Sequence, residues 1–286
     1  MNPSRRKGGR PALHLGAAIV CLAAMVAAFV VFFPYGPACR YLEGEILRRT
    51  GLAVTIGDLA WGLPPRLRLF RLTWQPPVAD WPPVTVDELT AAPVWSSLIG
   101  GNVAVALEAR LGAGLLRGEL RQDGDLRGEV AALALRPFFP ARFAYPPQGN
   151  VHGSFVGGGG NGGAGRIGFE LTLSGLDVDG LAAVGFDNDR LSLGDVGIRG
   201  EVADGRLSVA ELGSQGGELV VRGSGSLLLA ADPRQAGLAV RLEVRPAGEL
   251  DPLLAGLLAA GGATAAADGT YRLQLDGTLA RPQLRR

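Results

Sequence analysis

The stretch GELVVRGSGSLLLA, residues 217–230, alternates apolar or small side chains with mostly polar ones over most of its length. One side of it carries, in chain order, Leu219, Val221, Gly223, Gly225, Leu227 and Leu229. Successive side chains of a strand point to opposite faces, so the pattern predicts a strand with one apolar and one solvated face. That apolar face needs a cover, and Gly223 and Gly225 leave room at its middle for a backbone or a ligand.

Three more stretches repeat this alternation, at 168–176, 237–245 and 270–279. Their apolar sides carry Phe169, Leu171, Leu173, Leu238, Val240, Leu242, Val244, Tyr271, Leu273 and Leu275. Strict alternation is typical of sheets that bury one face only, and these are usually antiparallel. We therefore expect the four apolar faces to line one continuous interior, a candidate apolar groove.

The only late helix that the sequence predicts is 249–262, and one helix is too small to cover the apolar faces of so many strands. Two arrangements could cover them. The sheet can fold onto itself as a sandwich or rolled barrel, which is the usual outcome. Alternatively, it curls into a trough whose floor contacts a lipid or another protein. Similar segments at 123–130, 204–212 and 268–275 each begin with Asp-Gly, and such repeated hairpins favour an elongated sheet.

The N-terminus predicts a membrane anchor. Residues 1–10 are basic, and the run from Leu15 to Phe33 is almost wholly apolar and about 20 residues long, enough for a helix to cross a bilayer. The basic flank places residues 1–10 in the cytoplasm, so 11–33 is expected to be a single transmembrane helix. A cleavable signal peptide is the alternative, but the apolar run continues past the small residues at 26–28. An amphipathic helix at the membrane surface is predicted for 34–50.

The fold class that follows is mainly β. We expect a transmembrane helix, then a periplasmic domain over 51–286 made of an elongated, curled antiparallel sheet with a few short helices. The bulk of the chain then lies outside the cytoplasm, in the periplasm of a bacterium with two membranes.

Composition excludes several classes of function. A net charge of +1 over 286 residues argues against a nucleic-acid binder. His14 and His152 are the only histidines, which rules out a multi-histidine metal site, and His152 lacks the partners of a catalytic triad. Cys21 and Cys39 both lie near the N-terminus, so the rest of the chain has no internal disulfide. Cys39 is expected to be a passive residue at the membrane exit, and pairing with another chain or acylation is the alternative.

Two motifs imitate ligand sites. The glycine tract 157–165 is followed by a predicted strand and lacks a lysine, so a flexible loop is favoured over a phosphate loop. The acidic segment 177–189 has its glycine two places too early for a calcium loop and no closing glutamate. No catalytic, cofactor-binding or metal-binding residue is predicted, and we expect a protein that is not an enzyme.

The order of segments resembles a known family. FPYGPACRYLEGEILRRTGLAVTIGDLAWGLPPRLRLFRLTW (33–74) and APVWSSLIGGNVAVALEARLGAGLLRGEL (92–120) resemble the N protein of the bacterial type II secretion system. The endings GELVVRGSGSLLL (217–229) and YRLQLDGTLARPQL (271–284) look like the AsmA-like superfamily of envelope proteins. The resemblance covers nearly the whole chain, from Phe33 to Leu284.

The resemblance implies an accessory component of type II protein secretion. Such a protein is held in the inner membrane by one anchor and contacts other secretion subunits in the periplasm. The alternative that it leaves open is an AsmA-like protein that binds or conveys phospholipid in an apolar β groove. The family offers no catalytic residues to carry over.

Overall fold

The computed structural model describes residues 34–62, 64–76, 81–99, 101–140, 143, 145–158, 165–185, 188–228, 235–248, 256, 263–278 and 281–285. The helices are α2 (Tyr35–Thr50), α3 (Trp95–Ile99), and the 3-10 helices η1 (Arg136–Phe138) and η2 (Leu181–Val184). The first strands are β1 (Val54–Gly62), β2 (Arg66–Trp74), β3 (Val84–Pro93), β4 (Ala104–Leu111), β5 (Gly114–Arg121), β6 (Leu126–Ala134) and β7 (Pro147–Gly158). The others are β8 (Arg166–Asp179), β9 (Arg190–Ala203), β10 (Arg206–Gly216), β11 (Leu219–Leu228), β12 (Gly237–Pro246), β13 (Thr264–Ala265), β14 (Tyr271–Thr278) and β15 (Arg281–Arg285).

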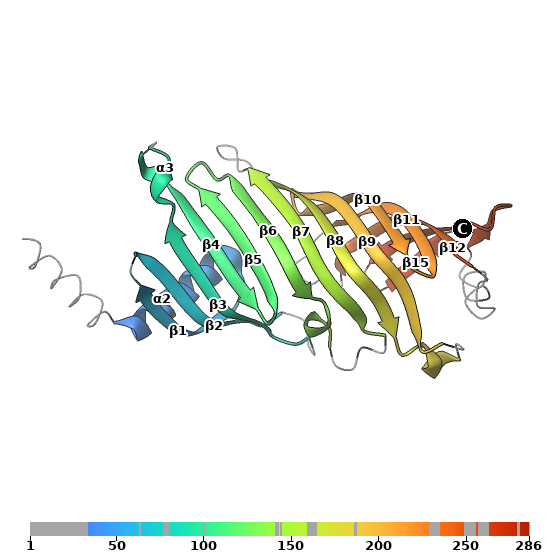
Figure 1. Cartoon of the computed structure of the whole chain (residues 1–286), viewed down its shortest axis with the longest axis horizontal. Helices are drawn as coiled ribbons and strands as arrows, with labels where there is room; N and C mark the ends of the chain where they lie inside the picture. The colour runs from blue at the N-terminus through green and yellow to red at the C-terminus, as the bar shows by residue number, and fades with distance from the viewer. Residues whose placement is uncertain are drawn as a thin grey trace, which may run out of the picture.

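All described strands belong to one antiparallel sheet. From β1 to β12 each strand pairs with the next one in the chain; β14 follows β12, and both β13 and β15 pair with β14. Figure 1 shows the sheet as a long ribbon of strands whose two ends do not meet. The expectation of a mainly β, antiparallel chain with few helices is confirmed for this part, and the described strands do not form a two-sheet sandwich.

Local sequence explains this succession of hairpins. Asp204 and Gly205 have φ angles of 51° and 69°, which a two-residue turn with the twist of β9 and β10 requires. Asp123-Gly124 lies in the turn before β6, and Asp268-Gly269 in the turn before β14. Each of the three predicted Asp-Gly turns therefore begins a strand of the sheet.

A β-bulge in β6 keeps the apolar side chains before and after it on the same face of the sheet. Ala132 has a φ of 52°, and the register of β6 with β7 shifts between Val130 and Leu133. The N–H of Ala132 donates to Nδ1 of His152 at 3.2 Å, so the histidine satisfies a donor that the ladder leaves out. His152 thus has a structural contact within the sheet.

Helix α2 covers one end of the sheet. Cys39, which is 8% exposed, packs with Ile56, Leu59 and Leu69 into a cluster between α2 and strands β1 and β2. The helix ends where predicted, since Gly51 has a φ of 71° and its N–H donates to the carbonyl of Leu47. Burial, followed by the carboxylates of Asp58 and Glu43, raises the pKa of the Cys39 thiol from its ordinary value.

Some expectations fall on parts of the chain outside the described residues. These are the basic segment 1–10, the anchor 11–33, most of the glycine tract and, apart from Gly256, the helix 249–262. Among the helices that the structure does describe, none combines the length and apolar character needed to span a bilayer.

Candidate functional site

The strand register aligns side chains into four rows that cross the sheet on one face, here called the apolar face. The first row is Pro93, Val105, Leu120, Leu126, Gly157, Ile167, Val202, Leu207, Leu227, Leu238 and Gly277. The second is Ala91, Leu107, Gly118, Gly128, Phe155, Phe169, Gly200, Val209, Gly225, Val240 and Leu275.

The third row is Leu89, Ala109, Leu116, Val130, Gly153, Leu171, Ile198, Leu212, Gly223, Leu242 and Leu273. The fourth is Leu133, Val151, Leu173, Val196, Ser214, Val221, Val244 and Tyr271. These rows contain no charged residue from β3 to β14.

Ser214 is the one serine or threonine in these rows, and its hydroxyl both donates and accepts a hydrogen bond. Its Oγ donates to the carbonyl of Leu219 at 2.9 Å and accepts from the N–H of Val221 at 2.7 Å. The backbone pairing of β10 with β11 stops at Gly213 and Arg222, and the two hydrogen bonds of the Ser214 hydroxyl continue the link between the strands beyond that point. The serine therefore closes the sheet at this point and offers no free hydrogen-bonding group to the apolar face.

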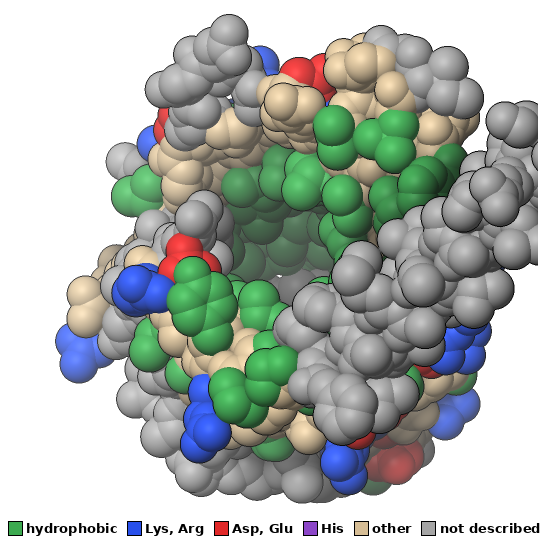
Figure 2. Space-filling view, turned by 90° about the vertical axis from the view of Figure 1, so that its left-hand side faces the viewer, with side chains coloured by type: hydrophobic (Ala, Val, Ile, Leu, Met, Phe, Trp, Pro, Cys, Tyr) green, Lys and Arg blue, Asp and Glu red, His purple; other side chains and the backbone are tan. Residues whose placement is uncertain are grey.

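The apolar face is hollow instead of packed. Figure 2, which looks along the molecule, shows a concave space lined by hydrophobic side chains, with charged side chains around the outside. Most residues of the four rows are only partly buried, and no large described side chain is fully buried. In the described part of the chain, α2 is the only helix that covers this face, over β1 and β2.

The structure places the sequence-predicted groove residues on this face. Phe169, Leu171 and Leu173 of β8 lie in the rows above, as do Val221 and Leu227 of β11, and Leu219 continues the same side of β11 beside Pro246. The same rows contain, from β12 and β14, Leu238, Val240, Leu242, Val244, Tyr271, Leu273 and Leu275. Leu229 lies outside the described residues.

Sequence reasoning missed the half of the apolar face that β3 to β7 supply. Leu116 and Val130 are cross-strand neighbours there, and Phe155 pairs directly with Phe169. Gly118 and Gly128 interrupt the apolar alternation of β5 and β6, which explains why the pattern was weak. The available signal was the alternation of Val105, Leu107 and Ala109 in β4.

The room beside Gly223 and Gly225 is filled by the neighbouring strand. A Cβ at Gly223 would lie 2.6 Å from Cδ2 of Leu242, and one at Gly225 would lie 2.8 Å from Cγ2 of Val240. Both side chains lie low over the glycines. Next to them is a hollow of about 220 Å³, lined by side chains of Leu207, Val209, Leu212, Leu227, Leu238, Val240 and Leu242.

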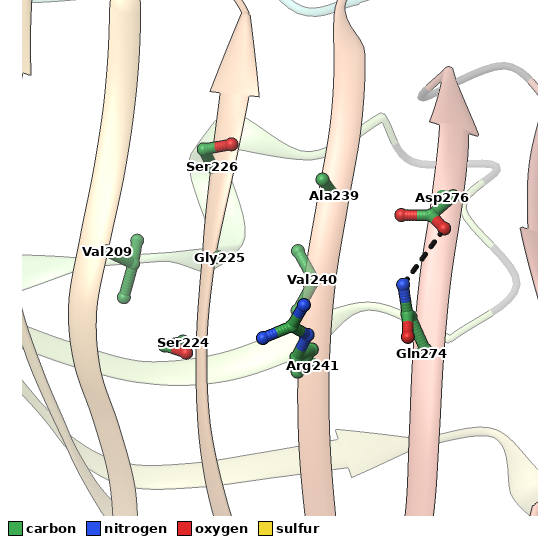
Figure 3. A pocket seen from close by; sticks show the side chains of 9 residues that line it. All are labelled: Val209, Ser224, Gly225, Ser226, Ala239, Val240, Arg241, Gln274 and Asp276. Atoms are coloured by element: carbon green, nitrogen blue, oxygen red, sulfur yellow. Dashed lines mark hydrogen bonds between the residues drawn. The ribbon is translucent and has the colours of Figure 1, made fainter. Parts of the chain in front are cut away.

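The opposite face of the same strands is polar. Figure 3 shows Ser224, Ser226, Arg241, Gln274 and Asp276 around a hollow of about 450 Å³, where Gln274 donates to Asp276 at 3.2 Å. Farther along this outer face, charges alternate from strand to strand. Arg199 bridges Glu170 (2.8 Å) and Glu211 (3.7 Å), as Arg117 bridges Glu108 and Glu129. The sheet thus separates a solvated surface from an apolar one.

The acidic segment 177–189 and the glycine tract 157–165, which look like ligand sites in the sequence, contribute to the sheet and its ion pairs in the structure. Arg190 lies 3.5 Å from Asp177 and 2.9 Å from Asp179, so these carboxylates of the acidic segment form ion pairs. Within the residues that the structure describes, no cluster of three or more His, Cys, Asp or Glu could hold a metal ion. Gly158 of the glycine tract ends β7 opposite Arg166 of β8.

Comparison of the chain with protein-family models, with curated proteins and with solved structures gives no match.

Proposed function

We propose that this protein is a non-catalytic component of the bacterial envelope whose apolar face binds the hydrocarbon chains of membrane lipids. The observation that supports it is the continuous, uncharged and only partly buried apolar face that crosses the sheet. Leaving so much apolar surface in water is unfavourable by about 25 cal/mol per Å², so an apolar occupant stabilises this shape.

The chemistry of the face favours an acyl chain over an extended peptide. A peptide brings N–H and C=O groups that need partners when buried, whereas an acyl chain has none. The sheet uses its own backbone groups in the strand ladders, and the hydroxyl of Ser214 is already engaged on both sides. An extended peptide in this space would therefore leave polar groups unsatisfied.

The test is lipid retention by the full chain with one residue of β12 changed. Leu242→Asp places a carboxylate on the apolar face, while Ala239→Asp places the same group on the exposed outer face of the same strand. We expect phospholipid to co-purify with the wild type and with Ala239→Asp, and to be reduced at least tenfold in Leu242→Asp. Mass spectrometry of the extracted lipids is the measurement. Equal lipid in both variants, or none with the wild type, would contradict the proposal.

The resemblance to the type II secretion N protein gives this role a setting. In this proposal residues 11–33 anchor the chain in the inner membrane, the sheet lies in the periplasm, and the protein assists secretion by contact with other secretion subunits. The specific observation in favour of a protein contact is a second apolar surface outside the groove. Trp95 is 54% and Leu98 42% exposed at the β3–β4 corner, and nearby Val103 is also exposed.

Site-specific photo-crosslinking tests this second role. A photoreactive amino acid at Leu98 is expected to capture a type II secretion subunit in living cells, whereas the same group at Arg110, which is solvated on the outer face of β4, is not. Products are identified by mass spectrometry. Capture at both positions alike, or at neither, would count against a secretion contact at this corner.

A further inference from the structure

Two phenylalanines at the middle of the apolar face lie flat over glycines of the adjacent strands. In the second row the register gives the consecutive neighbours Gly128, Phe155, Phe169 and Gly200, from β6 to β9. A Cβ at Gly128 would lie 2.8 Å from Cε1 of Phe155, and one at Gly200 would lie 2.7 Å from Cζ of Phe169. Each ring therefore occupies the space that a side chain on its glycine would take.

The rings lean in opposite directions. Phe155 and Phe169 are directly opposite each other on β7 and β8, yet Phe155 reaches over β6 and Phe169 reaches over β9. Side chains of a strand ordinarily stand roughly perpendicular to the sheet. Two upright phenyl rings at this position would project into the concave space from its floor. The glycines remove that obstruction, and the flattened rings keep the floor covered with apolar surface.

We infer that the Phe155–Gly128 and Phe169–Gly200 pairs keep the groove open at its middle, so that one long hydrocarbon chain lies across many strands. This inference rests on the proposed function and specifies its ligand. The ligand class is a lipid with a long unbranched chain, which extends past the hollow beside β10 to β12 toward β5. Phe155 and Phe169 are positioning residues of the groove, because their orientation sets its depth.

The experiment raises one ring and then removes it. Gly200→Ala is expected to push Phe169 upright, but its Cβ also meets the carbonyl of Ser208 on β10, so the backbone is disturbed as well. The double variant Gly200→Ala/Phe169→Ala keeps the backbone disturbance and lacks the ring. Comparing the two isolates the effect of the ring. Gly168→Ala is the matched control, since its Cβ points to the outer face of β8 with only ordinary contacts at 3.8 Å and beyond.

The readout is the dependence of affinity on chain length. Fatty acids of about eight to eighteen carbons displace a fluorescent fatty acid from the full chain, held in an amphipathic polymer because a detergent would itself compete. For the wild type and for Gly168→Ala, affinity should rise about twofold to fourfold with each added methylene over this range. For Gly200→Ala the rise should stop at short chains that the β10–β12 hollow alone accommodates. The double variant should regain the rise.

The outcomes separate this inference from the proposed function. If the wild type binds no fatty acid, the proposed function fails. If the wild type binds with a steady rise and Gly200→Ala rises equally, the proposed function stands and the inference is wrong. If the double variant remains as limited as Gly200→Ala, backbone disturbance explains the loss, and the role of the ring is refuted.

Discussion

The free edge of the sheet at β1 is closed by carboxylates, and removing one of them is a sharp test of the structure. The N–H of Ile56 donates to Oε1 of Glu43 in α2 at 2.7 Å, and the N–H of Leu59 donates to the carboxylate of Asp58 at 2.8 Å. β1 is the terminal strand, so unpaired N–H groups there would be a template for another strand. Glu43→Ala removes a charged acceptor from this edge and leaves its donor open.

The expected loss follows from that geometry. A hydrogen bond to a charged group contributes about 1.5–3 kcal/mol, and partial exposure of Glu43 to solvent reduces this to about 1–2 kcal/mol. For a domain of this size each kcal/mol changes the melting temperature by about 2–4 °C. Glu43→Ala should therefore melt about 2–8 °C lower than the wild type and should self-associate in sedimentation velocity.

Glu45→Ala is the control in the same helix. Glu45 forms an exposed ion pair with Arg48 at 2.6 Å, three residues along, which contributes only about 0.2–0.5 kcal/mol. If Glu43→Ala melts within about 1 °C of Glu45→Ala and stays equally monomeric, Glu43 does not protect the edge and our reasoning is refuted.

Two further predictions concern the α2 cluster. Leu59→Ala should lower the free energy of unfolding by about 2–5 kcal/mol in a denaturant titration, because Leu59 is buried against α2; an equal loss in the exposed Leu120→Ala would argue against a packed cluster there. The raised pKa of Cys39 means that above about pH 9 the unfolded thiol ionises while the native thiol keeps its proton, so this contribution to stability is full below pH 9 and is lost as pH rises. The stability difference between wild type and Cys39→Ala should therefore shrink from pH 7 to pH 10, and a constant difference would exclude the effect.

Much of this fold is predictable from local pattern. The alternation in 217–230 and the Asp-Gly turns are properties of neighbouring residues, and they correctly indicate an antiparallel, hairpin-rich chain. The helix predicted for 34–50, which is capped by Gly51, follows in the same way from local signals. Alternation does not predict what covers the apolar face, because a sandwich and an open trough both need strands with one apolar side.

The candidate site was predicted only where the apolar residues are large. Leucines and valines of β11 and β12 are conspicuous, but Gly118, Gly128 and Gly200 look like turns or breaks in a sequence. Their role depends on Phe155 and Phe169, which become neighbours only through strand pairing. The alternation within a single strand therefore does not predict that a side chain of the neighbouring strand will lie over a glycine.

The succession of strands has a consequence for how such a protein changes over evolutionary time. Nearly all contacts of a strand are with its immediate neighbours in the sheet, as in repeat proteins. Inserting or deleting a hairpin therefore alters the span of the molecule without rebuilding a common centre. At about 4.8 Å per strand, the path from β1 to β13 measures about 60 Å across the strands. Duplication of one hairpin would add about 10 Å, so natural selection can adjust the span of the sheet in steps of one hairpin.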